Sequence, residues 1–212
     1  MKKLVIPFVD YKRIFRTIYS ILLHENPVQM NHSCVPFSII GAFILHEHYK
    51  IKAKVAMGVA SYLLDEERMN VLAFAEKEEN HLTCSQKGFH SWIEVNESII
   101  DFTAPLFPQM IKIIDQKASC KSKMFQKPLS DMCVSVSDLE KQGDFFLGKD
   151  MVFSDQMVDH FLSRPLHTDL IEICCKWYKR PPRRMQESIG LGNNAGNIKK
   201  VTLKQFNILG TW

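Results

Sequence analysis

Two short alternating segments joined by two polar residues constrain the fold of this chain more than any other feature. Residues 89–95 and 98–102 alternate apolar and polar positions, as strands do, and Asn96 and Glu97 stand between them. A two-residue loop joins neighbouring antiparallel strands and fixes how their residues pair. The sequence therefore predicts a hairpin of known register.

This register brings several polar side chains to one face of the predicted sheet. His90, Trp92 and Glu94 alternate with apolar residues and point to the same side. The hairpin places Asp101 directly opposite Trp92 and diagonally from His90, on that same face. Diagonal neighbours have Cβ atoms roughly 7–8 Å apart or less, a gap that an imidazole and a carboxylate span with a hydrogen bond. We therefore predict that Asp101 orients His90.

Upstream of the hairpin, Cys34 begins a segment that predicts a buried helix. Residues 34–45 are apolar almost all round, which is typical of a helix in a core. Ser33 suits the cap before this helix, and Pro36 suits its first turn, where a missing N–H costs no hydrogen bond. A helix N-terminus favours negative charge and therefore the reactive thiolate of a cysteine. Cys34 is thus a candidate nucleophile, and an inert core thiol is the alternative.

The other periodic segments predict the class of the fold. Helical spacing of apolar residues marks helices at residues 10–24, 154–162 and 168–178. Further strands are expected at residues 54–64, 70–75 and 201–203, whereas residues 107–149 show no clear pattern. Helices, then an antiparallel meander, then helices predict an α+β fold with helices packed on an antiparallel sheet.

The length and composition predict one ordinary globular domain. The 212 residues are 46% hydrophobic and 24% charged, which suffices for a sizeable core without a disulfide or a metal. We expect a single domain over residues 1–212, with its core motifs at 29–105 and a C-terminal helical part at about 150–180.

The distribution of apolar residues and cysteines predicts the compartment. No stretch approaches the ~20 apolar residues of a membrane helix, and the run at residues 4–9 is too short for a signal-peptide core. The six cysteines show no C-x-x-C spacing, so neither a zinc ribbon nor a disulfide framework is expected. We expect a cytoplasmic protein with free thiols, no membrane contact, no metal and no cofactor.

The order of these features resembles a known group of enzymes. A cysteine opening a buried helix, a histidine in a Gly-x-His-x-Trp-x-Glu-Val strand and an aspartate on the next strand are similar to the papain-like and transglutaminase-like cysteine superfamily. The chain also looks like an uncharacterised bacterial family on that fold. The superfamily includes peptidases, transglutaminases and arylamine N-acetyltransferases. The resemblance covers about residues 29–105 and implies a cysteine-proteinase-like fold and thiol-dependent acyl transfer.

The resemblance also implies a role for each site residue. Cys34 would be the nucleophile, His90 the general base and then acid, and Asp101 the group that holds the imidazole. The expected substrate is a peptide or a small molecule with an amide or ester bond. The acyl group would pass to water or to an amine.

Candidates for the oxyanion hole and for substrate binding follow from the same resemblance. In papain-like enzymes a glutamine shortly before the cysteine helps to form the oxyanion hole, which points to Gln29, with Asn31 as the alternative. Trp92 is the further candidate for substrate binding. The papain signature Cys-Gly-Ser-Cys-Trp is absent, since Val-Pro-Phe occupies residues 35–37, and this favours the transglutaminase-like branch.

Two functions of other classes stay open. One is a non-catalytic binding or regulatory protein on the same fold. The other is a nucleic-acid-associated protein that uses the segment 176–184, which holds five basic residues and two aromatic ones. A net charge of +4 is too weak to favour nucleic acid by itself, and cations at a helix end also suit its dipole. The His-Glu-His run at 46–48 does not share a helix face, so it predicts no metal site.

Overall fold

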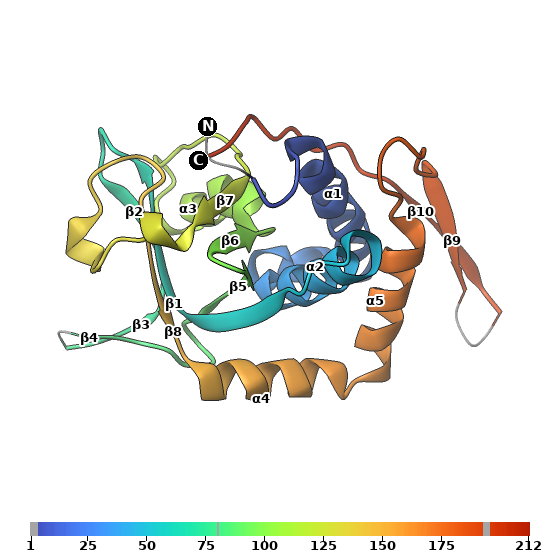
Figure 1. Ribbon diagram of the computed structural model, residues 1–212, viewed down its shortest axis with the longest axis horizontal. Coiled ribbons are helices and arrows are strands. Elements are labelled where there is room, and N and C mark those ends of the chain that lie inside the picture. Colours follow the sequence, from blue (N-terminus) through green and yellow to red (C-terminus); the bar gives the residue numbers. More distant parts are fainter. Residues whose placement is uncertain (1–3, 80, 193–195) are drawn as a thin grey trace.

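The computed structural model describes residues 4–79, 81–192 and 196–212, apart from the side chains of Gln29 and Asn31. An antiparallel sheet with a long, strongly curved central strand lies beside a group of helices that pack on it, which confirms the α+β expectation (Figure 1). The helices are α1 (Phe8–Glu25), α2 (Cys34–Tyr49), α3 (Phe107–Ile114), α4 (Met151–Leu162) and α5 (Pro165–Trp177).

Ten strands are present in the described residues. They are β1 (Lys54–Asp65), β2 (Asn70–Phe74), β3 (Glu76–Glu78), β4 (His81–Thr83), β5 (His90–Val95), β6 (Ser98–Asp101), β7 (Phe125–Pro128), β8 (Phe145–Lys149), β9 (Ser188–Gly192) and β10 (Ile198–Thr202). Six of them form the main sheet, while β3–β4 and β9–β10 are separate two-stranded hairpins that project from the body (Figure 1).

Strand β1 is the centre of the main sheet, because three strands pair with it. Gly58 pairs with both β5 and β8, and Tyr62 pairs with both β2 and β8. Since a strand has two edges, β8 occupies one of them, and β2 and β5 follow one another along the other edge. Strands β6 and β7 extend the sheet beyond β5. The end of β2 therefore meets the start of β5, where His90 lies.

The predicted hairpin register is confirmed. Val95 pairs with Ser98 and Ile93 with Ile100, across a two-residue turn. Asn96 adopts a φ of 52°, a left-handed conformation that asparagine tolerates better than most residues. The polar two-residue loop was therefore sufficient to place the side chains of both strands on their correct faces.

Helix α2 begins at Cys34, as predicted, and packs closely on the sheet at Gly41. A Cβ at this position would lie 2.5 Å from the ring of Phe102 and 3.1 Å from Ile93, so only glycine allows the approach. Because side chains alternate along a strand, Ile93 and His90 point to opposite faces. The body of α2 thus covers the face opposite His90, and its first turn reaches the point where β2 meets β5.

The segment without a clear pattern, residues 107–149, holds α3, β7 and β8, which complete the sheet and cover it. The two later helices begin earlier than predicted. Asp150 caps α4 by accepting a hydrogen bond of 2.9 Å from the N–H of Phe153, and Pro165 opens α5. Both are standard helix-start signals that stand before the segments with clear apolar spacing.

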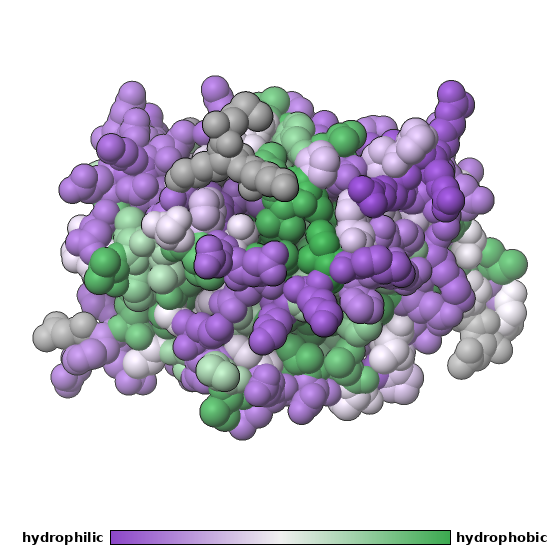
Figure 2. Space-filling view, viewed as in Figure 1, coloured by the Kyte–Doolittle hydropathy of each residue, from purple (hydrophilic) through white to green (hydrophobic). Residues whose placement is uncertain are grey.

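One face of the molecule is mostly hydrophilic, with apolar areas over the sheet side and along the middle (Figure 2). Within the described ranges, no helix combines the length and the apolar character needed to cross a membrane.

Candidate active site

His90 and Asp101 form a buried pair on the adjacent strands β5 and β6 of the main sheet. The imidazole Nε2 lies 2.7 Å from Oδ2 of Asp101, and both side chains are fully buried. Strand β5 supplies the histidine and β6 the aspartate, as the hairpin register predicts. The diagonal contact between the two strands is therefore present.

The Asp101 carboxylate is held from both sides. Its Oδ2 also accepts a hydrogen bond of 3.0 Å from the Tyr62 hydroxyl, and its Oδ1 accepts one of 2.8 Å from the N–H of Thr103. The hydroxyl of Tyr11 donates to the Asp101 carbonyl. Burial and then the negative charge of Asp101 raise the pKa of Tyr62 well above its usual value, so Tyr62 stays a neutral donor. A buried carboxylate with this many donors fixes the position of the imidazole.

Aromatic rings enclose the His90 imidazole. Phe74, at the end of β2, stacks on it with ring centroids 4.2 Å apart and planes 24° apart. Tyr62 and Phe107 approach at 5.7 Å and 5.9 Å. These contacts hold the plane of the ring and exclude water from the pair with Asp101.

The Cys34 thiol, at the start of α2, is close enough to His90 to influence the imidazole. Burial lowers the pKa of His90, but the charge and hydrogen bond of Asp101, followed by the neighbouring Cys34 thiol, more than offset it and raise the pKa to about 10. Among the described residues, Nδ1 of His90 has no hydrogen-bond partner of standard geometry. Since Nε2 is engaged by Asp101, Nδ1 is the nitrogen left for the thiol. Loose contacts of this kind are common in sites without substrate.

The start of α2 leaves backbone donors beside the sulfur. Ser33 occupies the cap position, but its hydroxyl donates to the carbonyl of Met30 at 2.5 Å, so the predicted side-chain cap is wrong. The first N–H groups of a helix have no partner within it, and Pro36 has no N–H at all. The N–H groups of Cys34 and Val35 therefore remain for an anionic oxygen.

The side chains of Gln29 and Asn31, the predicted oxyanion-hole groups, lie outside the described part of the structure. Their backbone belongs to the 3-10 helix Pro27–His32, which leads directly into α2.

A groove of about 550 Å³ opens over Cys34. Its walls are residues 72–75 at the end of β2, residues 86–89 before β5, and the last turns of α3. Gly88 holds two of these walls together, because a Cβ there would lie 2.3 Å from the backbone of Ala75. The glycine of the Gly-x-His motif thus fixes the distance between β2 and β5 next to the imidazole.

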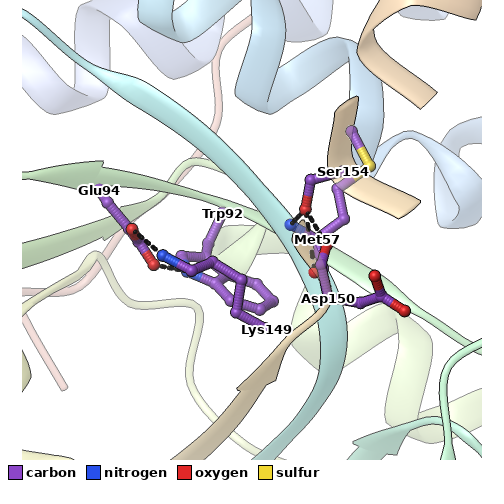
Figure 3. A network of polar contacts seen from close by, with 6 residues as sticks. All are labelled: Met57, Trp92, Glu94, Lys149, Asp150 and Ser154. Carbon is purple, nitrogen blue, oxygen red and sulfur yellow. Dashed lines mark hydrogen bonds and ion pairs between the residues drawn. The ribbon is translucent and has the colours of Figure 1, made fainter. Parts of the chain in front are cut away.

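Trp92, predicted to bind substrate, is not among the residues that line this groove. It is 1% exposed, and its indole N–H donates to Glu94 at 3.3 Å. Glu94 also pairs with Lys149 at 2.8 Å, across β1 (Figure 3). The predicted face is therefore correct, but the contacts of Trp92 are those of a packed structural side chain.

Residues that complete the site were missed at the sequence level. Tyr62 and Phe74 lie on β1 and β2, and their contacts with the pair depend on how distant strands align. The even-numbered residues of β1 share the face of His90, so Tyr62 was on the correct face of a predicted strand. No local signal indicated that it would reach Asp101.

Burial raises the pKa of the other five cysteines, to about 11 for Cys120 and about 12 for Cys175. All six are free thiols. Cys34 alone lies beside a histidine that is held by a carboxylate.

The two weaker sequence signals have structural contacts. In the basic segment, Lys176 pairs with Glu172, and the Arg180 guanidinium lies 4.5 Å from the centre of the Tyr49 ring. His48 contacts the carbonyl of Cys175 at 2.9 Å. The described part of the chain contains no group of three or more metal-ligating side chains.

The protein is similar to known proteins over nearly its whole length. A solved structure described as "The crystal structure of genomics APC5867" is similar, with a TM-score of 0.87 and 32% sequence identity over 100% of this chain and 99% of that one. No curated protein matches. The model of the family described as "Protein of unknown function (DUF2026)" matches residues 7–212. The chain therefore belongs to the DUF2026 family.

Proposed function

We propose that this protein is a thiol-dependent acyl-transfer enzyme with a Cys34–His90–Asp101 triad, acting as a cysteine peptidase or amidase or as a transglutaminase-like acyltransferase. The proposal includes a cysteine-proteinase-like fold of the papain-like and transglutaminase-like superfamily. One observation carries it: a buried imidazole is held through Nε2 by a carboxylate and has its other nitrogen free for a thiol at a groove.

In the first step Cys34 attacks the carbonyl carbon of an amide or ester. A His90 with a raised pKa is protonated at neutral pH, so it pairs with the thiolate and is ready to act as an acid. The carbonyl oxygen gains negative charge beside the first N–H groups of α2, which stabilise it. His90 then protonates the leaving amine or alcohol, and a thioester to Cys34 remains.

In the second step water or an amine attacks the thioester. His90, now neutral, takes the proton of the attacking molecule, and the thiolate leaves. Asp101 keeps the imidazole in one orientation through both steps and stabilises its charged form. The proposal places the reaction in the cytoplasm, where thiols stay reduced, with a peptide, amide or ester as substrate.

Limited alkylation tests the nucleophile. With substoichiometric iodoacetamide at pH 7, we expect Cys34 to be modified first, because it opens helix α2 and lies beside a histidine that is held by a carboxylate. Peptide mass spectrometry gives the order of modification. Equal labelling of all six cysteines, or preferential labelling of Cys174 or Cys175, would contradict the proposal.

A further inference from the structure

Two exposed apolar side chains line the groove over Cys34. Ile113 and Ile114, at the end of α3, are 66% and 69% exposed and both face the groove. Single exposed apolar residues are common, but two adjacent ones that line the hollow next to a candidate nucleophile mark a binding surface.

Other side chains that line the groove are also apolar. Leu72, Phe74, Phe89 and Met110 also line it, from β2, the segment before β5 and α3, so apolar side chains predominate in its lining. Its volume of about 550 Å³ lies within the usual range for small-molecule sites.

The polar residues of the groove are exposed, and none of them carries a negative charge. These residues are Gln86, Lys87 and His32. The lining includes no carboxylate, so a cationic group that entered the groove would meet Lys87 and no counter-ion.

We propose that this groove binds the acyl part of the substrate, and that the substrate carries an uncharged aliphatic or aromatic acyl group. The inference rests on the proposed thiol chemistry. Cys34 itself lines the groove, whereas its neighbours Ser33 and Val35 line an adjacent hollow of about 440 Å³, with which the groove shares His32. The group that stays bonded to the sulfur in the thioester therefore occupies the groove that the sulfur faces.

The test compares p-nitrophenyl acetate, hexanoate and 6-aminohexanoate. Cys34 forms a thioester with the acyl carbon, the ester C–O bond breaks, and p-nitrophenol leaves with the proton from His90. Each buried methylene contributes roughly a factor of four. After correction for hydroxide-catalysed hydrolysis, we expect hexanoate to acylate Cys34 at least about tenfold faster than acetate or 6-aminohexanoate.

Variants of the groove wall separate its contribution from intrinsic ester reactivity. Ile113→Gln/Ile114→Gln should reduce the preference for hexanoate to about threefold or less. Val152→Gln is the matched control, because Val152 is 67% exposed on α4 and does not line the groove. Equal normalised rates for the three esters, or an unchanged preference in the double variant, would overturn the inference while leaving the thiol chemistry in place.

Binding to a protein without the thiol distinguishes the two proposals. In Cys34→Ala, hexanamide should bind more tightly than acetamide in calorimetric titration, and the Ile113→Gln/Ile114→Gln changes should remove the difference. If no ester acylates Cys34 while hexanamide still shows this preference, the proposed enzyme function fails and the apolar site stands. If neither acylation nor preferential binding is found, both fail.

Discussion

Two polar clusters lie on the same face of the sheet and share strand β5, but they differ in what they leave unpaired. In the first, the fully buried His90 and Asp101 pair at 2.7 Å, and Nδ1 of His90 has no partner of standard geometry in the described chain. In the second, Trp92, Glu94 and Lys149 satisfy one another, and the Lys149 side chain is 40% exposed (Figure 3).

The difference separates a candidate site from a structural contact. A buried polar atom without a good partner costs free energy. Several described side chains have such an atom, and Nδ1 of His90 is the one that lies next to the candidate nucleophile Cys34. The self-paired cluster carries no such cost, since its ion pair is partly solvated and its indole is packed. Both clusters place an ionisable side chain on β5, so the presence of charge alone does not identify the candidate active site.

The largest expected effect is on thiol chemistry. His90→Gln should slow acylation of Cys34 by p-nitrophenyl hexanoate by about 10²–10⁴-fold, because it removes the general acid and base. Glu94→Gln, two strand positions beyond Trp92, should stay within about twofold, because Glu94 does not line the groove. Stopped-flow absorbance of the released p-nitrophenol measures both rates.

Similar losses in the two variants would remove the distinction between the clusters. The folded state of each variant is checked by circular dichroism, so that a loss of structure is not read as a loss of chemistry.

The second effect is on stability. Asp101→Ala leaves His90, the Tyr62 hydroxyl and the Thr103 N–H without their acceptor in a buried place, and we expect a loss of about 3–5 kcal/mol in the free energy of unfolding. Lys149→Met removes a partly exposed ion pair, so we expect a loss of no more than about 1 kcal/mol. Urea titrations give both values. A larger loss for Lys149→Met than for Asp101→Ala would reverse the comparison.

The third effect is a pH dependence. The pKa of His90 is raised to about 10, so between the unfolded value near 6.5 and that folded value the folded chain binds the extra proton. Its contribution is fully present below pH 6.5, and stability falls as pH rises towards 10. We expect the free energy of unfolding to decrease from pH 6.5 to 8, below the range where unfolded cysteines ionise.

The matched variants identify the group responsible for this slope. His90→Gln should flatten it, whereas Glu94→Gln should leave it unchanged. If the pH dependence of the free energy of unfolding persists in His90→Gln, another group causes it. The inference that His90 is protonated in the folded protein would then be wrong.

The first cluster could be predicted only where its contacts are local in the sequence. A two-residue loop set the β5–β6 register, so the diagonal placement of His90 and Asp101 followed from period-two alternation. The start of α2 followed from an apolar run that opens at Cys34. Each of these rests on a few consecutive residues.

The contacts that complete the site depend on long-range packing. Tyr62 and Phe74 reach the pair because β2 and β5 lie end to end on one edge of β1, a consequence of where β8 pairs. β7 and β8 are only four and five residues long, and Pro128 and Gly148 blur their pattern. Trp92 lies on the predicted face, but the ion pair of its neighbour Glu94 comes from Lys149 on the distant strand β8, which no local pattern indicates.

The smallest expected effect distinguishes two buried cysteines. Cys34 is 8% exposed at a groove, while Cys174 is fully buried in α5. Cys34→Ser should change the melting temperature by less than about 3 °C, because its hydroxyl faces the imidazole and the groove. Cys174→Ser puts a hydroxyl into an apolar core and should cost roughly 1–3 kcal/mol, a larger shift. Differential scanning calorimetry compares the two. A loss above about 3 kcal/mol for Cys34→Ser would mean that its sulfur is needed for packing, and Cys34 would then be a structural thiol like Cys174.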